Sequence, residues 1–556
     1  CSVDNRNHRA RFFAEIVAGD RLTLYNTTVW FWLNSGMMPC LGGRHGKTAE
    51  KLKVNESLLK TVLCSATFWG LLAHGMVLFN KYSFHDDARY FNDVGVTYKS
   101  GRWMLGILGS LSANLLGSKN YSLPVVNGTI TILCIAAIVY LLADSLRIQS
   151  KPLVILLCGS MVTFPSVTGT FSYMFTAPYY YAASLLGVVG AWIFHQKKNF
   201  VALLLCTVLM ACSVGVYQAN IPVFICTLLL YMMEDVRQSD MSWKAFWKMA
   251  LCNATVCIGF IAEYFLVNQY FLNQFGVVLT DYKGINHFGR TNLSNYIYRM
   301  LCGYGSFFYP STAVEDFSAR YIYTLLIVVT AIIAIFVLRK MYILKTPKGS
   351  QTLLILIAYP IAACFVYLMV EPWDVHAVMT FGQAFAFALV VWLIDKYPED
   401  RTKVEGALCK AAVALLGVLV TLNIRYSNIL YLKADVMQTQ MISYYTTLIT
   451  RIESVEGYTE DAQVVYIEEY DKHDKNFVGV SEYFDDLDLP TYKGELIFND
   501  YAWKETMELW CGFAPELGDA AEFEGNAEVA SMPCYPEQGS IRCIDGKIVV
   551  KFADEQ

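Results

Sequence analysis

Charged side chains are scarce in this sequence. Asp, Glu, Lys and Arg together make up 16% of the 556 residues, whereas soluble domains carry about 25% charged residues. Hydrophobic residues reach 55%, and the mean hydropathy is +0.38. This composition excludes an ordinary soluble protein, because too few charges are present to cover a water-facing surface. It favours a protein that crosses a lipid bilayer several times.

Closely spaced cysteine pairs are also missing, although the chain has 16 cysteines. No two of them are three positions apart, which excludes the C-x-x-C motifs of zinc and thiol-redox sites. Most lie inside apolar runs, where cysteine is a small buried hydrophobic residue. Cys534 and Cys543 lie in a polar region instead. We expect them to form either a disulfide in an oxidising compartment or two thiols.

Basic residues do not gather along one face, and their distribution differs between the two parts of the chain. Residues 425–556 hold 26 acidic and 10 basic side chains, a net charge of −16, whereas residues 1–424 carry +11. The basic residues of the first part sit in short clusters between apolar runs. This pattern excludes nucleic acid as a partner, because a nucleic-acid-binding surface needs a continuous basic stripe.

Apolar runs of about 20 residues, enough to cross a bilayer as a helix, recur along the first 424 residues. They predict eleven spans, at 61–79, 123–143, 152–170, 179–195, 199–217, 219–233, 246–268, 321–338, 352–370, 377–395 and 407–424.

The loops between these runs alternate in charge. Loops 171–178, 217–220 and 371–376 have no Lys or Arg. Basic clusters instead precede the first span and follow every second one: Arg44, Lys47, Lys51, Lys53 and Lys60; Arg147 and Lys151; Lys197 and Lys198; Arg237, Lys244 and Lys248; Arg339, Lys340, Lys345 and Lys348; Lys396, Arg401 and Lys403. Basic loops stay in the cytoplasm, so we expect a cytoplasmic N-terminus and an outer C-terminus.

We therefore predict an α-helical polytopic membrane protein in three parts. These are a cytoplasmic N-terminal segment (1–60), a transmembrane domain (61–424) and an acidic extracytoplasmic domain (425–556). In the last part, 427–455 has helical periodicity, whereas 462–470 and 547–552 alternate as strands do. The third part is therefore expected to be a small α/β domain on a helical stalk.

The stretch SFHDDARYFNDVGVTYKSGRW (83–103) places many charges directly after the first span. Ionisable groups at a membrane surface are usually functional. A carboxylate of Asp86 or Asp87 is suited to act as a general base on a sugar hydroxyl. Asp93 lies about two helical turns beyond Asp87, so it can share a face with this pair and contact a sugar.

Three basic residues follow the aspartates, and these are Arg89, Lys99 and Arg102. Arg offers a bidentate fork to a phosphate, and Lys offers a point charge. A base beside a phosphate clamp suits transfer from a lipid-phosphate-linked donor. The alternative is a solvated loop whose charges pair with one another. The next segment, 104–118, is too short for a span and has one apolar face, so we expect an interfacial helix.

Other polar residues fall in loops of the same outer face. Tyr217, Gln218 and Asn220 follow one span, and Glu371, Asp374 and His376 follow another. Aromatic and amide groups commonly contact sugars, so Tyr217, Gln218, Glu371 and His376 are candidates for sugar or acceptor binding; the alternatives are loop packing and interfacial solvation. Tyr179, Tyr180 and Tyr181 are expected to form an interfacial belt rather than a sugar platform. In the loop 269–320, the further alternatives are Asp281, Lys283, Arg290 and Arg299.

Four short motifs carry a resemblance to a known family. A DD-x-R motif (Asp86, Asp87, Arg89) is followed by SGRWML (100–105). FPSVTGTFSYMFTAPYYYAASLL (164–186) and SVGVYQANIPVF (213–224) come later. Over about 60–395 the chain resembles the bacterial and phage O-antigen type glucosyltransferases, which belong to the GT-C class of polytopic glycosyltransferases. Trp103 departs from the Pro often found there.

The resemblance implies a GT-C-like fold in the bacterial inner membrane, and transfer of a hexose, glucose in this family. The donor would be a polyprenyl phosphate sugar on the extracytoplasmic face, and the acceptor a surface glycan. An aspartate of the first outer loop would be the base, with Asp87 slightly preferred to Asp86, and Arg102 would hold the donor phosphate. We expect no required cofactor and no metal site, with a divalent cation as the alternative.

Two other functions stay open from the sequence. A transporter or flippase of a lipid-linked sugar would explain the many spans, but we find no internal repeat and the charge lies in outer loops rather than at mid-membrane. A receptor would use the acidic domain to bind a cationic partner or Ca²⁺.

Overall fold

The computed structural model describes most of the chain. The described residues are 54–83, 86–280, 291–308, 317–343, 347–397, 401–467 and 502–554. Most of the predicted N-terminal segment, and Asp281, Lys283 and Arg290, lie outside them.

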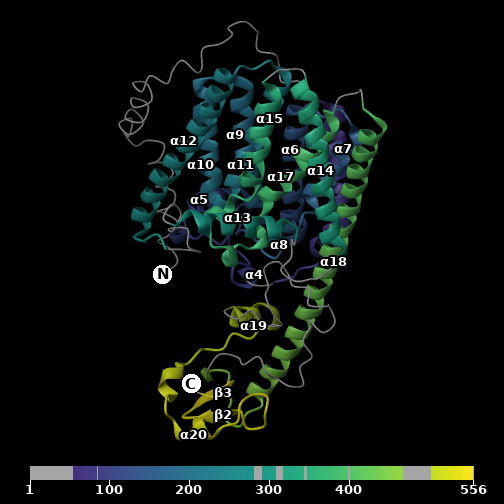
Figure 1. Ribbon diagram of the computed structural model, residues 1–556. Coiled ribbons are helices and arrows are strands. Elements are labelled where there is room, and N and C mark those ends of the chain that lie inside the picture. Colours follow the sequence, from purple (N-terminus) through teal and green to yellow (C-terminus); the bar gives the residue numbers. More distant parts are fainter. Residues whose placement is uncertain are drawn as a thin grey trace.

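A bundle of helices makes up most of the described residues between 54 and 424 (Figure 1). The longer helices are α3 (Glu56–Phe79), α6 (Pro124–Ser145), α9 (Ala177–Lys197), α11 (Ile221–Gln238), α12 (Trp243–Phe275), α14 (Phe317–Ile343) and α18 (Lys403–Glu453). The shorter ones include α7 (Lys151–Val162), α8 (Pro165–Phe171), α10 (Phe200–Val216), α13 (Leu293–Phe308), α15 (Lys348–Ala363) and α17 (Phe385–Asp395).

Helices occupy all the predicted spans, but not all are long enough to be assigned to the membrane. Seven described helices are long and apolar enough to cross a bilayer, and the number is eight if α7 and α8 form one broken span. The protein is therefore an integral, multi-pass membrane protein. The eleven spans predicted from the sequence exceed the seven or eight that helix length and composition support.

Proline marks where many of the helices begin. Helices α6, α7, α8, α9 and α11 each have Pro in their first two positions, where its missing N–H is not needed. Pro165 also explains the break between α7 and α8. It forces Phe164 into an extended conformation, and the two helices meet at 43°.

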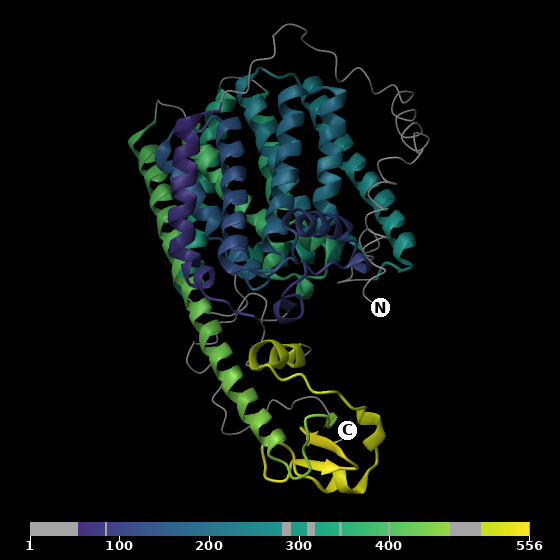
Figure 2. The same ribbon diagram turned by 180° about the vertical axis from the view of Figure 1, so that it is seen from behind.

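Helix α18 continues beyond the bundle and carries the C-terminal domain (Figure 2). It runs unbroken through the predicted boundary at 424/425, and it confirms the helical stalk. Strands β1 (Val464–Ile467), β2 (Ile541–Ile544) and β3 (Lys547–Lys551) form one sheet in the order β1-β3-β2. Strand β1 is parallel and β2 antiparallel to β3. The strands expected within 462–470 and 547–552 are therefore present, in a small sheet with β2 as an additional strand.

The C-terminal domain lies on the same side of the bundle as the loop after α3. Helix α19 (Trp503–Cys511) contacts α4 (Asp86–Arg89), and both atoms Nε and Nη2 of Arg89 donate to Oε1 of Glu505, at 3.0 and 2.9 Å. The predicted common side of the acidic tail and the first loop is confirmed. Cys534 and Cys543 are not joined in a disulfide.

Candidate active site

Asp87 is bound into the loop that follows α3. Its side chain is fully buried and forms an ion pair with Lys81. It also accepts hydrogen bonds from the hydroxyl groups of Ser83 (2.9 Å) and Ser122 (2.6 Å). Burial lowers the pKa of Lys81 below its usual value, and the neighbouring Asp87 carboxylate offsets only part of this effect. All these contacts link α3, α4 and the start of α6, so Asp87 holds the loop together.

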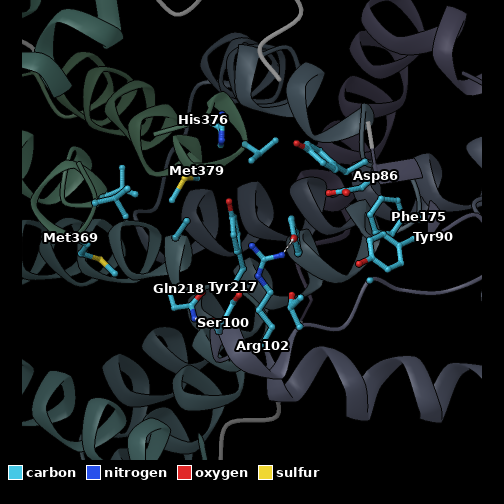
Figure 3. A pocket seen from close by; sticks show the side chains of 18 residues that line it. Asp86, Tyr90, Ser100, Arg102, Phe175, Tyr217, Gln218, Met369, His376 and Met379 are labelled. Carbon is cyan, nitrogen blue, oxygen red and sulfur yellow. Dashed lines mark hydrogen bonds between the residues drawn. The ribbon is translucent and has the colours of Figure 1, made fainter. Parts of the chain in front are cut away.

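Asp86 lies on another side of the same short helix and lines a cavity of about 310 Å³ (Figure 3). Successive residues in a helix point about 100° apart, which separates the two aspartates. Tyr90, one turn later, lines the same cavity. Burial raises the pKa of Tyr90, and the charge of Asp86 adds to this, so its hydroxyl group stays protonated at neutral pH.

Arg102 enters the cavity beside two tyrosines. Its Nη1 donates a hydrogen bond to the Tyr180 hydroxyl at 3.1 Å. Its guanidinium carbon lies 5.2 Å from the ring centroid of Tyr217, which is cation–π distance. The rings of Tyr180 and Tyr217 stack with their centroids 4.3 Å apart and their planes at 5°. The arrangement places a positive charge and a flat aromatic surface on one wall.

Gly101 allows the turn that delivers Arg102. Its φ is +75°, a conformation that only glycine adopts readily. Gln218 packs against this turn by donating to the carbonyl oxygen of Ser100 at 2.7 Å, and the Tyr264 hydroxyl donates to the carbonyl oxygen of Gly101 at 3.3 Å. A Cβ atom at position 101 would lie 2.1 Å from that hydroxyl. The S-G-R motif is therefore a backbone turn that needs glycine, because the φ of Gly101 is positive and the Tyr264 hydroxyl leaves no room for a Cβ atom.

Trp103 fixes the start of α5 (Trp103–Leu116) against the bundle. Its ring stacks on Phe271 of α12, with centroids 5.7 Å apart and planes at 9°. A Cβ atom at Gly215 of α10 would lie 2.5 Å from it, so the glycine makes room for the indole. The predicted helix at 104–118 is confirmed. The residue that departs from the family pattern is thus an anchor for α5.

The opposite wall of the cavity comes from the segment after α15. Helix α16 (Val366–Met369) and the short helix η6 (Ala377–Met379) supply mainly apolar side chains. His376 lies between these two elements and also lines the cavity. Helix α8 packs against η6. The cavity therefore gathers segments from four distant parts of the sequence.

Of the residues predicted from the sequence, Asp86, Arg102, Tyr217, Gln218 and His376 line this cavity. The others lie outside its lining. Asp87 is ion-paired as described, and Arg89 binds Glu505. Lys99 and Asp93 are exposed, and the Asp93 carboxylate accepts from the backbone N–H of Val94. Glu371 forms an ion pair with the buried Arg299 of α13.

The three consecutive tyrosines do not act as one belt. Tyr180 and Tyr181 are buried, so the prediction that they belong to an interfacial belt is wrong. Tyr180 lines the cavity, Tyr181 packs against Phe381, and Tyr179 donates to Asn120 at 3.2 Å. Sequence reasoning also missed Tyr90, Met369 and Met379 as cavity residues, because their types are common in any helical core. The only signal for Tyr180 was its place inside a family motif.

The described part of the chain holds no group of three or more His, Cys, Asp or Glu side chains arranged to bind a metal ion.

Comparison with known proteins gives one match. No curated protein and no solved structure matches the chain. Residues 75–387 match the family described as glucosyl transferase GtrII, and this range includes the cavity lining on both walls. Because the match covers more than half of the 556 residues, the protein belongs to the glucosyl transferase GtrII family, a bacterial and phage O-antigen glucosyltransferase family, and it is a glucosyltransferase.

Proposed function

We propose that the protein transfers glucose from a polyprenyl phosphate to a hydroxyl group of a surface glycan, and that the transfer takes place in the cavity lined by Asp86 and Arg102. The observation that supports this is the meeting of a carboxylate, a guanidinium group and a stacked tyrosine pair in one cavity. These are the groups needed to accept a proton, to hold a phosphate and to contact a sugar ring.

The proposed reaction uses each group once. An oxygen of the acceptor hydroxyl attacks C1 of the donor glucose, and the bond between C1 and the phosphate oxygen breaks. The carboxylate of Asp86 takes the hydroxyl proton. The polyprenyl phosphate leaves with the bonding electron pair, and Arg102 offsets the negative charge that grows on it. Tyr180 orients the guanidinium group through its hydrogen bond.

The size of the cavity indicates which parts of the two substrates it can enclose. About 310 Å³ is at the lower end of the roughly 300–1,000 Å³ of ligand pockets, so it holds a sugar and a phosphate rather than a polysaccharide. The acceptor chain would therefore lie outside, beside α4 and the C-terminal domain that contacts it.

We infer the membrane arrangement from the loops and the helices together. Helix α10 and the helix over Phe381–Asp395 are apolar but shorter than a full span. Eleven crossings are proposed because the basic loops alternate along the whole bundle. In this arrangement the cavity and the C-terminal domain lie on the extracytoplasmic face of a bacterial inner membrane.

The test compares Asp86→Asn with Asp87→Asn in membranes supplied with labelled polyprenyl phosphate glucose and acceptor glycan. We expect Asp86→Asn to lower turnover about 10²–10⁴-fold, the usual contribution of a general base. Glu56→Gln is the matched control, because Glu56 is exposed at the far end of α3. Wild-type turnover in the Asp86→Asn variant would refute the assignment of the base. Transfer from a nucleotide sugar but not from the lipid donor would refute the donor.

A further inference from the structure

The cavity changes from polar to apolar along its length. Asp86 lies toward one end, Arg102 near the middle and Met369 toward the other end (Figure 3). Around Arg102 the lining includes Thr97, Ser100 and Gln218. A ligand with a uniform polar surface would not match such a lining, whereas a molecule with a polar head and a hydrocarbon tail would.

The apolar end comes from two short helices and the residues next to them. Five side chains form it, and these are Val366, Met369, Val370, Val378 and Met379. No Lys, Arg, Asp or Glu is among the described residues that line this end. Apart from Val378, these side chains are buried and belong to the apolar core, so this end of the cavity borders the apolar interior. A hydrocarbon chain can lie against this lining without burying an unpaired polar group.

Methionine suits this position because it is unbranched and adapts its shape to a ligand. Met369 is the last residue of α16 and Met379 is the last residue of η6. These two elements are separated by only seven residues, which include His376. The segment thus places a polar imidazole group near the phosphate region and two flexible thioethers beyond it.

We propose that this apolar end, around Met369 and Met379, is a binding subsite for the first isoprene unit of the donor lipid. The inference rests on the proposed function, because it takes the donor to be a polyprenyl phosphate sugar. It fixes the direction of the donor: glucose points to Asp86, the phosphate lies at Arg102, and the hydrocarbon chain leaves along α16. A nucleotide sugar would place a second phosphate and a base against the same apolar side chains, so the subsite also disfavours that donor class.

The first experiment maps the subsite by crosslinking. The full-length protein in lipid nanodiscs is incubated with polyprenyl phosphate glucose that carries a diazirine group on its first isoprene unit, and with a second probe that carries it on the last unit. Peptide mass spectrometry then locates the crosslinks. We expect the first probe, and not the second, to label residues 366–370 or 377–379. Labelling by the first probe confined to the region of Asp86 and Tyr90 would overturn the proposed direction.

The second experiment measures KM. Met379→Gln and Met369→Gln keep the length of the side chain but bury an amide beside hydrocarbon. We expect each to raise KM for the lipid donor about tenfold, which corresponds to 1.4 kcal/mol, with kcat nearly unchanged. KM for glucosyl ethyl phosphate, which has no isoprene unit, should not change. Met379→Leu and Met369→Leu keep an apolar side chain of similar volume, so we expect them to raise KM for the lipid donor much less than the Gln variants do.

The outcomes separate this inference from the proposed function. An equal rise of KM for the lipid donor and for the ethyl donor would overturn the subsite, while the function would stand. Failure of the wild-type protein to use either phosphate donor would overturn the function itself. Unfolded variants are recognised by their thermal unfolding, and the crosslinking result does not depend on any variant.

Discussion

Two neighbouring aspartates have different surroundings in this protein. Asp86 faces the cavity, whereas Asp87 is fully buried with Lys81 and two serines. A buried ion pair contributes little net stability when it is intact, but removing one partner leaves an uncompensated charge. The same substitution therefore has different consequences at the two positions.

We expect Asp87→Asn to lower the free energy of unfolding by about 3–5 kcal/mol, because Lys81 loses its counter-charge. Asp86→Asn should leave stability within about 0.5 kcal/mol of wild type. Thermal unfolding in detergent checks both. If Asp87→Asn is as stable as wild type and loses turnover, Asp87 rather than Asp86 would be the base.

Gly101 and Gly117 provide a second test at the residue scale. Both have positive φ, +75° and +64°, but only Gly101 lacks room for a Cβ atom. We expect Gly101→Ala and Gly117→Ala each to lose about 1–3 kcal/mol from backbone strain. Only Gly101→Ala should also lose glucose transfer, because the clash with Tyr264 displaces Arg102. Equal transfer by the two variants would show that the turn does not position Arg102.

The dependence on divalent cations is a third question at this scale. We expect glucose transfer to be unchanged by EDTA, because Arg102 offers the leaving phosphate a bidentate, charge-assisted hydrogen bond. Turnover is measured in EDTA and again after adding Mg²⁺ or Mn²⁺. Loss in EDTA that either ion restores would mean that a metal, rather than Arg102 alone, stabilises the phosphate.

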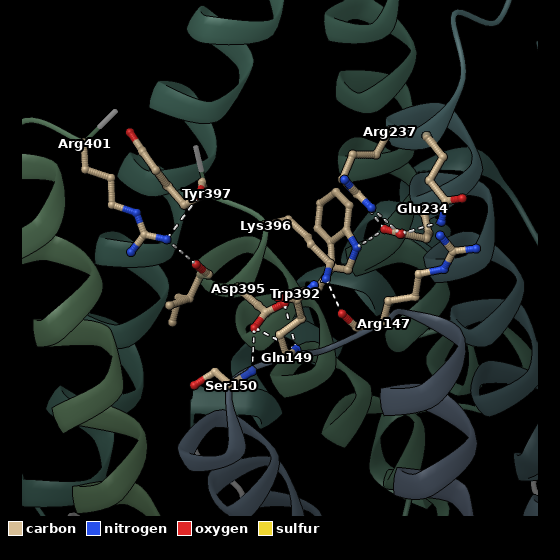
Figure 4. A network of polar contacts seen from close by, with 12 residues as sticks. Arg147, Gln149, Ser150, Glu234, Arg237, Trp392, Asp395, Lys396, Tyr397 and Arg401 are labelled. Atoms are coloured by element: carbon tan, nitrogen blue, oxygen red, sulfur yellow. Dashed lines mark hydrogen bonds and ion pairs between the residues drawn. The ribbon is translucent and has the colours of Figure 1, made fainter. Parts of the chain in front are cut away.

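At the scale of elements, polar networks hold both ends of the bundle. Away from the cavity, Glu234 of α11 accepts from Arg237 and Trp392 (Figure 4), and Asp395 accepts from the backbone at the start of α7. At the cavity end, α13 makes two polar contacts with the segment 371–384. Arg299 pairs with Glu371, and Gln383 donates to the carbonyl oxygen of Gly303 at 3.0 Å. This segment carries His376 and Met379 into the cavity.

Arg299 is fully buried, and its Nε and Nη1 atoms have no hydrogen-bond partner among the described residues. We expect Glu371→Met or Arg299→Met alone to destabilise the protein by about 3–5 kcal/mol, whereas the double variant recovers most of this loss. KM for the donor should rise in each single variant and return toward the wild-type value in the double variant, because loosening the segment 371–384 moves His376. Additive losses in the double variant would show that the two side chains do not act as a pair.

At the scale of the whole molecule, the C-terminal domain is docked on the helix that carries Asp86. The Arg89–Glu505 pair is partly exposed, so it contributes about 0.2–1 kcal/mol at most. The larger link is α18, whose residues Met441, Tyr445, Leu448 and Ile452 join the core of the domain. The domain is therefore held beside α4 by a helix that also belongs to the bundle.

Removing residues 441–556 tests what the domain contributes. A cut at 425 would also remove Tyr431 and Met437 from the core of the bundle, whereas a cut after 440 keeps the hydrogen bonds of Gln438 to the loop after α3. We expect transfer to the glycan to fall about tenfold or more, while hydrolysis of the donor by water continues. Loss of hydrolysis in a folded variant would place the domain in catalysis rather than in acceptor binding.

Sequence patterns indicated one segment of the cavity lining but not the residues that complete it. The D-D-x-R and S-G-R motifs lie in a loop that lines the cavity, through Asp86, Ser100 and Arg102. The slight preference for Asp87 is not supported by its position, because a pair of adjacent aspartates gives no sign of which one is buried. Tyr180 was assigned to an interfacial belt, because tyrosine near a helix end is typical of that position.

The sequence by itself determined the membrane class, the positions of most helices and the acidic composition of the C-terminal part. These features depend on local properties: apolar length, periodicity, capping and the conformations that glycine and proline allow. Only the tertiary structure decided which charges face the cavity and which are paired. Glu505 meets Arg89 from 416 positions away, and His376 shares a cavity with Asp86. Such neighbours depend on how each helix is rotated and packed, which no local pattern records.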